Sequence, residues 1–157
     1  MSLKRTGKDP LIVIVSNRGP FSFTHRENGI FDVERGAGGL VTALGALAEK
    51  HEVLWIASAM SEDDRLWTET HEDEIQSVEG VYMRLVRPAE DAYEKYYGVI
   101  SNPLLWFIQH QLWDAPRTPS ITQETWDAWH EGYLPINRLL ADAVIESLND
   151  IERPVII

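Results

Sequence analysis

The sequence predicts an α/β fold with a mainly parallel sheet and an inserted β-hairpin, and three observations support this. The continuous apolar, β-branched run at residues 11–15 is typical of a strand buried on both faces, and residues 53–57 and 81–86 are expected as two further strand segments. Segments with helical spacing alternate with these runs, as in βαβ units. Asn28-Gly29 separates two short segments and supplies the positive φ angles that a tight hairpin turn requires.

The first strand, residues 11–15, is expected at the centre of the sheet because its apolar run is unbroken. Residues 21–24 and 30–33 should form the hairpin. Leu40, Ala43, Leu44 and Leu47 then recur at i, i+3, i+4 and i+7, which predicts one face of a helix that ends near Lys50.

Residues 53–57 and 81–86 are expected as the second and third strands. The acidic stretch 61–74 between them predicts a partly exposed helix. Within it, Asp63-Asp64 is interpreted as a solvated acidic face.

The second half of the chain is predicted to be more helical, with a helix over residues 89–97. Asn102-Pro103 predicts a new helix that runs to about Trp113, because Asn is a good N-cap and Pro suits the first helical position. Helical spacing of apolar residues continues from 126 to 148. Residues 154–157 resemble the start of another buried strand.

Composition excludes several classes of function. The 157 residues fit one domain of ordinary size, and the absence of cysteine excludes disulfides, zinc ribbons and thiol nucleophiles. With 14 basic and 25 acidic residues, the charge of −11 argues against a nucleic-acid partner. The basic residues 1–10 are expected to be flexible, and the run at 11–15 is too short for a membrane span or signal peptide. We therefore expect a cytoplasmic protein with no metal, no cofactor and no membrane partner.

A glycine-rich turn, Gly36-Ala37-Gly38-Gly39, precedes the first predicted helix. Such a turn presents backbone N–H groups and a helix N-terminus that can hold a phosphate. Val41 stands where the dinucleotide fingerprint requires glycine, and the Gly-Lys-Ser/Thr ending of the P-loop is absent. The alternative is that Gly38 and Gly39 only permit a tight turn and close helix packing.

Two further features could bind a ligand. Arg18 directly follows the predicted central strand, where its guanidinium could bind a phosphate or carboxylate, although an arginine in a loop more often forms an ordinary salt bridge. Trp106, His110 and Trp113 share a helical face, with Tyr96-Tyr97 shortly before it. The adjacent side is expected to face the core, through Leu105, Ile108 and Leu112. Aromatic rings with polar tips suit a sugar, which has apolar C–H patches between hydroxyls.

The other aromatic and imidazole side chains have simpler interpretations. We expect four other tryptophans to fill the core: Trp55, Trp67, Trp126 and Trp129. The remaining histidines are interpreted as surface or hydrogen-bonded residues: His25, His51, His71 and His130.

Several of these motifs together resemble a known family. The segments 16–18, 37–40, 97–106 and 129–137 look like the N-terminal half of the retaining glycosyltransferases that make trehalose 6-phosphate. The match covers nearly all of the chain from Leu11 onward. The resemblance implies a GT-B enzyme with two facing Rossmann-like domains, in which the N-terminal domain binds the acceptor and the C-terminal domain binds the nucleotide. Residues 11–157 would then be the acceptor-binding domain, without the nucleotide-binding one.

The resemblance implies transfer of glucose from UDP-glucose to glucose 6-phosphate with retention, in an enzyme that could be a homo-oligomer. It also assigns roles to individual residues. Arg18 would contact the acceptor phosphate, and the N–H groups of Gly38 and Gly39 would approach the diphosphate of the sugar nucleotide. Tyr97 would hydrogen-bond the acceptor, and Trp106 would form a wall of its pocket. No protein nucleophile and no metal are implied, and this part of the enzyme should be inactive alone.

Alternatives to this function remain open. The hairpin at residues 21–33 is longer than the loop of some family members, and relatives of similar sequence make glucosylglycerol phosphate or pseudo-disaccharide phosphates. A non-catalytic, sugar-phosphate-binding regulatory domain would use the same pocket. A nicotinamide-dependent oxidoreductase is disfavoured by Val41.

Overall fold

The computed structural model describes residues 10–36, 39–48, 50–111, 119–149, 151 and 154–157. The chain forms two compact units. The sheet unit comprises Met1–Arg87 together with Asp142–Ile157, and the helical unit comprises Pro88–Ala141. The segment expected to be flexible at the N-terminus lies outside the described residues, apart from Pro10.

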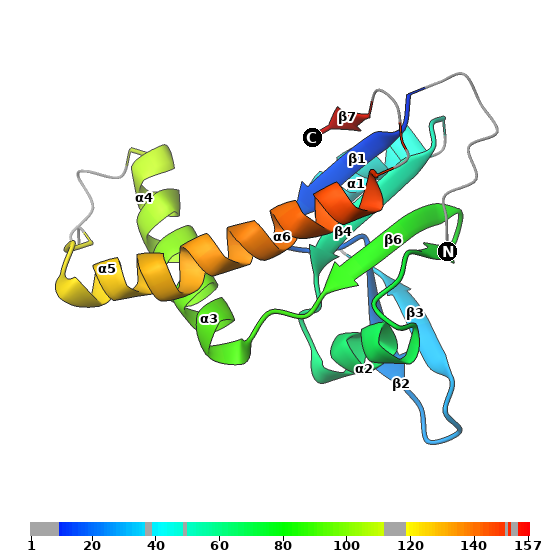
Figure 1. The fold of residues 1–157 in the computed structure, drawn as a ribbon, viewed down its shortest axis with the longest axis horizontal. Coiled ribbons are helices and arrows are strands. Elements are labelled where there is room, and N and C mark those ends of the chain that lie inside the picture. Colours follow the sequence, from blue (N-terminus) through cyan, green and yellow to red (C-terminus); the bar gives the residue numbers. More distant parts are fainter. Residues whose placement is uncertain (1–9, 37–38, 49, 112–118, 150, 152–153) are drawn as a thin grey trace. The chain divides into compact units, whose positions relative to one another are not determined.

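A five-stranded sheet forms the centre of the sheet unit, in the order β5-β6-β4-β1-β7 (Figure 1). Its strands are β1 (Ile12–Ser16), β4 (Val53–Ser58), β5 (Gln76–Val78), β6 (Val81–Val86) and β7 (Val155–Ile156). All neighbours pair in parallel except β5 and β6, which are antiparallel. The predicted mainly parallel sheet is confirmed. The first strand, β1, is an interior strand between β4 and β7, but the middle strand is β4.

The edge strand β5 is a feature that the sequence did not predict. It has three residues and pairs antiparallel with β6 through a turn at Glu79 and Gly80, both with positive φ. A short polar strand such as this has too few residues to show an alternating pattern, so periodicity alone cannot detect it.

The predicted hairpin is present as β2 (Phe21–His25) and β3 (Phe31–Arg35), which pair antiparallel and project from the sheet beside α2 (Figure 1). Gly29 has φ +80° in the turn, as the Asn-Gly pair predicts. The helix α2 (Glu62–Thr70) packs against β2, where the rings of Phe23 and Trp67 stack 3.9 Å apart.

Asp64 corrects the interpretation of Asp63-Asp64 as a solvated acidic face. Its carboxylate is buried and accepts hydrogen bonds from the backbone N–H groups of Phe23 (2.9 Å), Met60 (3.2 Å) and Ser61 (3.0 Å). The Ser61 hydroxyl in return accepts from the Asp64 N–H at 3.0 Å, which completes a capping box at the start of α2. The spacing Ser61-x-x-Asp64 was the sequence signal for this role.

Helices cover both faces of the sheet. Leu44 and Leu47 of α1 (Gly39–Ala48) pack against a core cluster that includes Ile12, Ile14, Val53, Trp55, Met83 and Leu85. Arg84 lies between Met83 and Leu85, so it points to the opposite face. There its guanidinium donates to the Ala143 carbonyl (3.0 Å) and pairs with Glu146 (2.6 Å), which holds the end of α6 (Leu134–Ser147) on that face.

The helical unit contains two π-helices, which the sequence analysis did not predict. Its elements are α3 (Glu90–Glu94), η1 (Lys95–Leu105), α4 (Trp106–Gln109), α5 (Gln123–Ala128), η2 (Trp129–Tyr133) and the first part of α6. The helix runs without a break through Asn102-Pro103, so the prediction of a new helix start there is wrong. Pro103 has no N–H to donate and crowds the preceding turn, which disfavours regular α-helical bonding at this point.

Within the helical unit, the backbone of η2 packs directly against the start of η1. A Cβ atom at Gly132 would lie 2.5 Å from Cβ of Lys95 and 2.6 Å from the backbone nitrogen of Tyr96. The backbones meet there because residue 132 has no side chain. Nearby, the Lys95 ammonium bonds Glu131 at 2.5 Å, and this hydrogen bond raises the pKa of Lys95. In the part of the chain that the structure describes, no helix has the length and apolarity needed to cross a membrane.

Candidate functional site

Arg18 stands at the carboxyl edge of the sheet, two residues beyond the end of β1. Two hydrogen bonds shape this loop: the Trp55 indole N–H donates to the Ser16 hydroxyl (2.8 Å), which donates to the Arg18 carbonyl (2.7 Å). The Arg18 side chain is exposed, and its guanidinium has no hydrogen bond or ion pair with any other described residue. This arrangement leaves a free cation where open α/β sheets bind their ligands.

The glycine-rich turn returns to the same loop. The Gly36 N–H donates to the Pro20 carbonyl at 2.8 Å, and a Cβ at Gly36 would lie 3.3 Å from the Gly19 carbonyl oxygen. Glycine at 36 therefore permits this close contact. Gly39 is the first residue of α1, so its backbone N–H belongs to the unpaired first turn of the helix. Gly38 lies outside the described residues.

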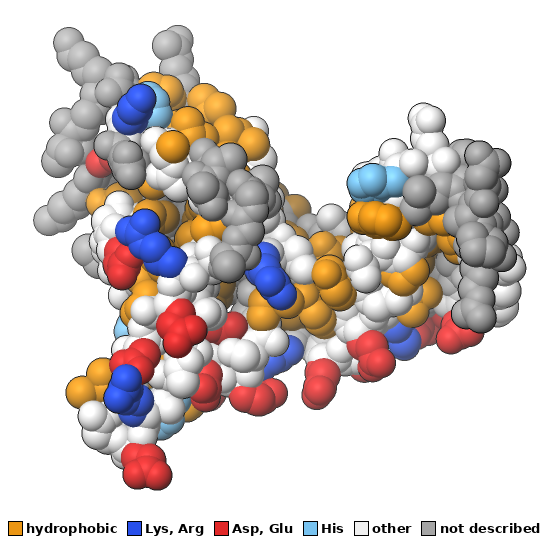
Figure 2. All heavy atoms as spheres, turned by 180° about the vertical axis from the view of Figure 1, so that it is seen from behind, with side chains coloured by type: hydrophobic (Ala, Val, Ile, Leu, Met, Phe, Trp, Pro, Cys, Tyr) orange, Lys and Arg blue, Asp and Glu red, His pale blue; other side chains and the backbone are white. Residues whose placement is uncertain are grey.

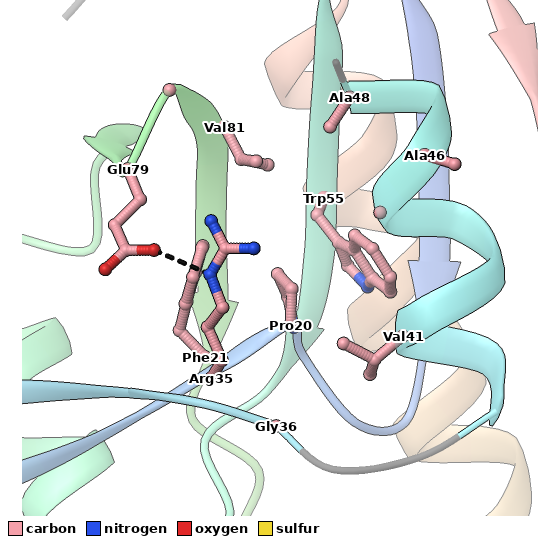
Figure 3. A pocket seen from close by; sticks show the side chains of 12 residues that line it. Pro20, Phe21, Arg35, Gly36, Val41, Ala46, Ala48, Trp55, Glu79 and Val81 are labelled. Carbon is pink, nitrogen blue, oxygen red and sulfur yellow. Dashed lines mark hydrogen bonds and ion pairs between the residues drawn. The ribbon is translucent and has the colours of Figure 1, made fainter.

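A pocket of about 470 Å³ lies beside this loop, between α1 and the turn that joins β5 and β6 (Figure 3). Its volume is in the range of small-molecule sites. Its lining is mostly apolar or glycine: Pro20, Phe21, Gly36, Val41, Gly45, Ala46, Ala48, Trp55, Gly80 and Val81. Arg18 and Gly39 do not line it.

The charged groups of the pocket are Arg35 and Glu79, which pair at 2.8 Å (Figure 3). The Arg35 guanidinium also lies 5.9 Å from the centre of the Phe21 ring. Glu79 already compensates the charge of Arg35. An anion would therefore bind less strongly to Arg35 in this pocket than to the unpaired guanidinium of Arg18.

Tyr97 and Trp106 lie in the helical unit, and both side chains are exposed, at 41% and 49%. The Trp106 ring stacks on His110 at 4.4 Å, and Nδ1 of His110 lies 2.8 Å from the Trp106 carbonyl oxygen. Trp67 and His71 repeat this geometry in α2, at 4.6 Å and 2.7 Å, but there the tryptophan is buried. The same local motif therefore presents Trp106 to solvent instead of to a core.

A continuous series of aromatic rings supports Tyr97. Tyr93 stacks on Tyr97 (6.1 Å) and contacts Tyr96 (5.8 Å), and Tyr96 stacks on Tyr133 (5.9 Å), which stacks on Trp129 (4.4 Å). Burial raises the pKa of Tyr96, the ring at the centre of this series. The series fixes the helix backbone from which Tyr97 projects.

The structure corrects two expectations about the aromatic and apolar residues. Trp126, expected in the core, is 54% exposed, whereas Trp55 and Trp67 are buried as expected. Ile108, expected to face the core, is 42% exposed, and Phe107 is buried in its place. The α-helical period counted from Asn102 therefore assigned the wrong side of this helix to the core.

The predicted site residues fall into two groups. Arg18 and Gly39 belong to the sheet unit, and Tyr97 and Trp106 belong to the helical unit. Sequence reasoning missed Asn102 as a side chain exposed within a helix, because it was interpreted as an N-cap. No group of three or more potential metal-ligating side chains occurs among the residues described.

Charge is distributed in agreement with a small-molecule site. The face in Figure 2 shows many acidic side chains, with Lys and Arg in isolated positions between them. Such a face does not resemble the broad basic surfaces that bind nucleic acid.

Comparison with known proteins gives a consistent result. Residues 10–157 match the family Glycosyltransferase family 20. A trehalose-6-phosphate synthase of Mycolicibacterium smegmatis is 33% identical over 131 residues, which are 83% of this chain and 23% of that protein. An α,α-trehalose-phosphate synthase (UDP-forming) of Schizosaccharomyces pombe is 26% identical, over 88% of this chain and 25% of that protein. The chain thus spans about a quarter of the length of these relatives.

Solved structures show the same fold. A trehalose-6-phosphate synthase structure named OtsA superposes with a TM-score of 0.56 at 21% identity, over 86% of this chain and 26% of that one. A structure from E. coli bound with UDP-2-fluoro glucose gives a TM-score of 0.54 at 21% identity, over 87% of this chain and 25% of that one. The expected Rossmann-like α/β fold of a GT-B enzyme is therefore confirmed.

Proposed function

Because the chain belongs to glycosyltransferase family 20, we propose that it is the acceptor-binding part of a retaining glucosyltransferase that makes trehalose 6-phosphate. The donor is UDP-glucose and the acceptor is glucose 6-phosphate. The names of the curated relatives support this reaction. Their greater length supports a division of labour in which this part alone binds substrate but transfers no glucose.

The exposed, unpaired Arg18 carries the proposal. A guanidinium binds a phosphate through two parallel charge-assisted hydrogen bonds, and the Arg18 side chain has no competing partner among the described residues. Arg18 therefore binds the phosphate of the acceptor. The first N–H groups of α1, beginning with that of Gly39, bind the diphosphate of the donor. A contact of the Gly38 N–H with the same diphosphate stays a prediction from the sequence.

Tyr97 and Trp106 bind the sugar of the acceptor. Two exposed aromatic side chains suit the apolar C–H faces of a pyranose, and the Tyr97 hydroxyl can donate or accept a hydrogen bond. The indole of Trp106 is held by its contact with His110, which limits the entropy lost when a sugar stacks on it.

The transfer needs no protein nucleophile. The bond between C1 of glucose and the diphosphate oxygen breaks, and the acceptor hydroxyl forms a new bond to C1 on the same face. The hydroxyl proton passes to an oxygen of the departing diphosphate. The contribution of this chain is to position the acceptor.

Replacement of Arg18 tests the proposal. In the 157-residue chain, we expect Arg18→Ala to weaken binding of glucose 6-phosphate by about 1.5 to 3 kcal/mol, the range for a charge-assisted hydrogen bond. Binding of unphosphorylated glucose should stay unchanged, and calorimetric titration measures both. Arg26→Ala is the matched control, because Arg26 is also exposed but pairs with Asp32 in the hairpin. Equal losses for glucose and glucose 6-phosphate would show that Arg18 is not the phosphate ligand.

A further inference from the structure

The π-helix η1 brings Tyr97 and Trp106 to one side of the helical unit. The two residues are nine positions apart, and in an α-helix of 3.6 residues per turn nine positions end on the opposite side. A π-helix bonds residue i to i+5 and has roughly 4.4 residues per turn, so nine positions make about two complete turns. Residues Lys95–Leu105 are π-helical, and both aromatic side chains are exposed. The unusual helix therefore explains how the two rings share one face.

Asn102 lies on this same face, about one π-helical turn from each aromatic residue. It follows Tyr97 by five positions and precedes Trp106 by four, and its side chain is exposed. In contrast, Tyr96 and Ile100 of η1 and Phe107 of α4 are buried. We name the exposed side, formed by Tyr97, Asn102 and Trp106, the aromatic–amide face.

Ser101 is the other polar residue at this level of the helix. Its hydroxyl oxygen is buried, so it points away from solvent. The Asn102 carboxamide, in contrast, has no hydrogen-bond partner among the described residues. Asn102 therefore provides the exposed polar group between the two rings.

Neither capping nor helix propensity explains asparagine at this position. The helix continues through residue 102, so Asn102 is no N-cap, and asparagine in a helix interior is less favourable than alanine. A carboxamide does provide a donor and an acceptor side by side. Two adjacent hydroxyls of a pyranose can bond both groups, one hydroxyl to the carboxamide oxygen and the other to its NH₂ group. Aromatic rings on either side can then contact the C–H groups of the sugar.

We propose that Asn102 is a sugar-binding residue that hydrogen-bonds adjacent hydroxyls of the hexose phosphate held by Tyr97 and Trp106. This inference rests on the proposed function, because it specifies how the acceptor site recognises the sugar rather than the phosphate.

Binding of glucose 6-phosphate and its monodeoxy analogues to the 157-residue chain tests the role of Asn102. Asn102→Ala should weaken glucose 6-phosphate about fivefold for one lost hydrogen bond and about thirtyfold for two. The decisive readout is the analogue series. At least one deoxy analogue should bind the wild-type chain more weakly than glucose 6-phosphate but should bind Asn102→Ala as well as glucose 6-phosphate does.

Two controls separate binding from folding. The melting temperature of Asn102→Ala should equal or exceed that of the wild type, because alanine has the higher helix propensity. Gln123→Ala removes another exposed amide of the helical unit, one that bonds Asp127 on its own helix, and should leave the affinity unchanged. Asn102→Asp keeps the size of the side chain but removes its donor, and should also lower the affinity.

The outcomes distinguish this inference from the proposed function. The role of Asn102 alone would be overturned if the wild-type chain bound glucose 6-phosphate tightly and Asn102→Ala bound it equally well. It would also be overturned if Asn102→Ala lost the same factor in affinity for every deoxy analogue as for glucose 6-phosphate. Failure of the wild-type chain to bind glucose 6-phosphate would overturn the proposed function, and the role of Asn102 with it.

Discussion

The Asp64 side chain joins three segments of the sheet unit. Its carboxylate accepts hydrogen bonds from backbone N–H groups of the hairpin, of the loop after β4 and of the start of α2. These bonds place the hairpin next to α2, and the hairpin connects Arg18 to the glycine-rich turn. The position of the candidate phosphate ligands thus depends on a carboxylate that touches no substrate.

Replacement of Asp64 should therefore destabilise the protein strongly. We expect Asp64→Ala to lower the free energy of unfolding by about 3 kcal/mol or more, because buried N–H groups lose a charged acceptor. Urea denaturation measures this change. Asp63→Ala is the control, since Asp63 accepts one exposed N–H, from His25, and should cost less than about 1 kcal/mol. Similar costs for the two variants would contradict the structural role of Asp64.

The Tyr96 hydroxyl makes the free energy of unfolding depend on pH, and the sign of this dependence follows from its pKa. Burial raises the pKa of its hydroxyl above the ordinary value near 10. Above about pH 10 the phenol ionises in the unfolded chain but stays protonated in the folded one, so the folded state binds more protons and stability falls as the pH rises. Below that pH the phenol is protonated in both states and contributes no dependence.

The comparison of Tyr96→Phe with the wild type measures this contribution. The free energy of unfolding between about pH 9 and 11 should fall less steeply in Tyr96→Phe, which keeps the ring stacked on Tyr133. Tyr97→Phe retains the Tyr96 hydroxyl but removes a neighbour whose charge contributes to the raised pKa of Tyr96, so its slope should lie between those of the wild type and Tyr96→Phe. An unchanged slope in Tyr96→Phe would show that the Tyr96 phenol does not titrate abnormally.

At the scale of elements, the two π-helices determine which residues of the helical unit face solvent. The sequence predicted helices in this region, but an α-helical period placed Ile108 inside, and Asn102-Pro103 was interpreted as a helix start from the capping preferences of Asn and Pro. Patterns of apolar residues cannot distinguish a period of 3.6 from a wider one over two turns, and tertiary contacts decide between them. The contact of η2 with η1 at Gly132 is one such constraint.

Two glycines of the helical unit should respond to alanine in opposite directions. Gly132→Ala places a Cβ atom against the backbone of η1 and should destabilise by about 2 to 3 kcal/mol. Gly98→Ala meets only Cγ of Glu94, at 3.9 Å, and should be neutral or stabilise by up to about 1 kcal/mol. Thermal unfolding of both variants checks the packing. Equal stability of the two would contradict the close approach at Gly132.

At the scale of the whole molecule, patterns that repeat along the chain predicted the fold well. Apolar runs identified β1 and β4, the mostly apolar segment 81–86 identified β6, and the Asn28-Gly29 pair identified the hairpin. Each of these patterns reflects the burial or the backbone geometry of its own segment. The edge strand β5, the buried Asp64 and the π-helices depend on contacts between segments. A local pattern carries little information about such contacts.

The sequence identified individual residues of the candidate site, but it did not show which of them lie together. The exposure of Arg18, Tyr97 and Trp106 agrees with a ligand-binding role, and their roles stay predictions. Asn102 was recognised in the sequence only as a capping residue, because its place between the two rings exists only in the π-helical register.

The central claim is that a hexose phosphate binds at the Trp106 ring. The six tryptophans give indole N–H signals in a ¹⁵N–¹H spectrum, and single Trp→Phe variants assign them. On addition of glucose 6-phosphate, the Trp106 signal should shift and saturate, while buried Trp67 and exposed Trp126 should not move. A spectrum in which no indole signal shifts, or in which Trp126 shifts as much as Trp106, would contradict the account.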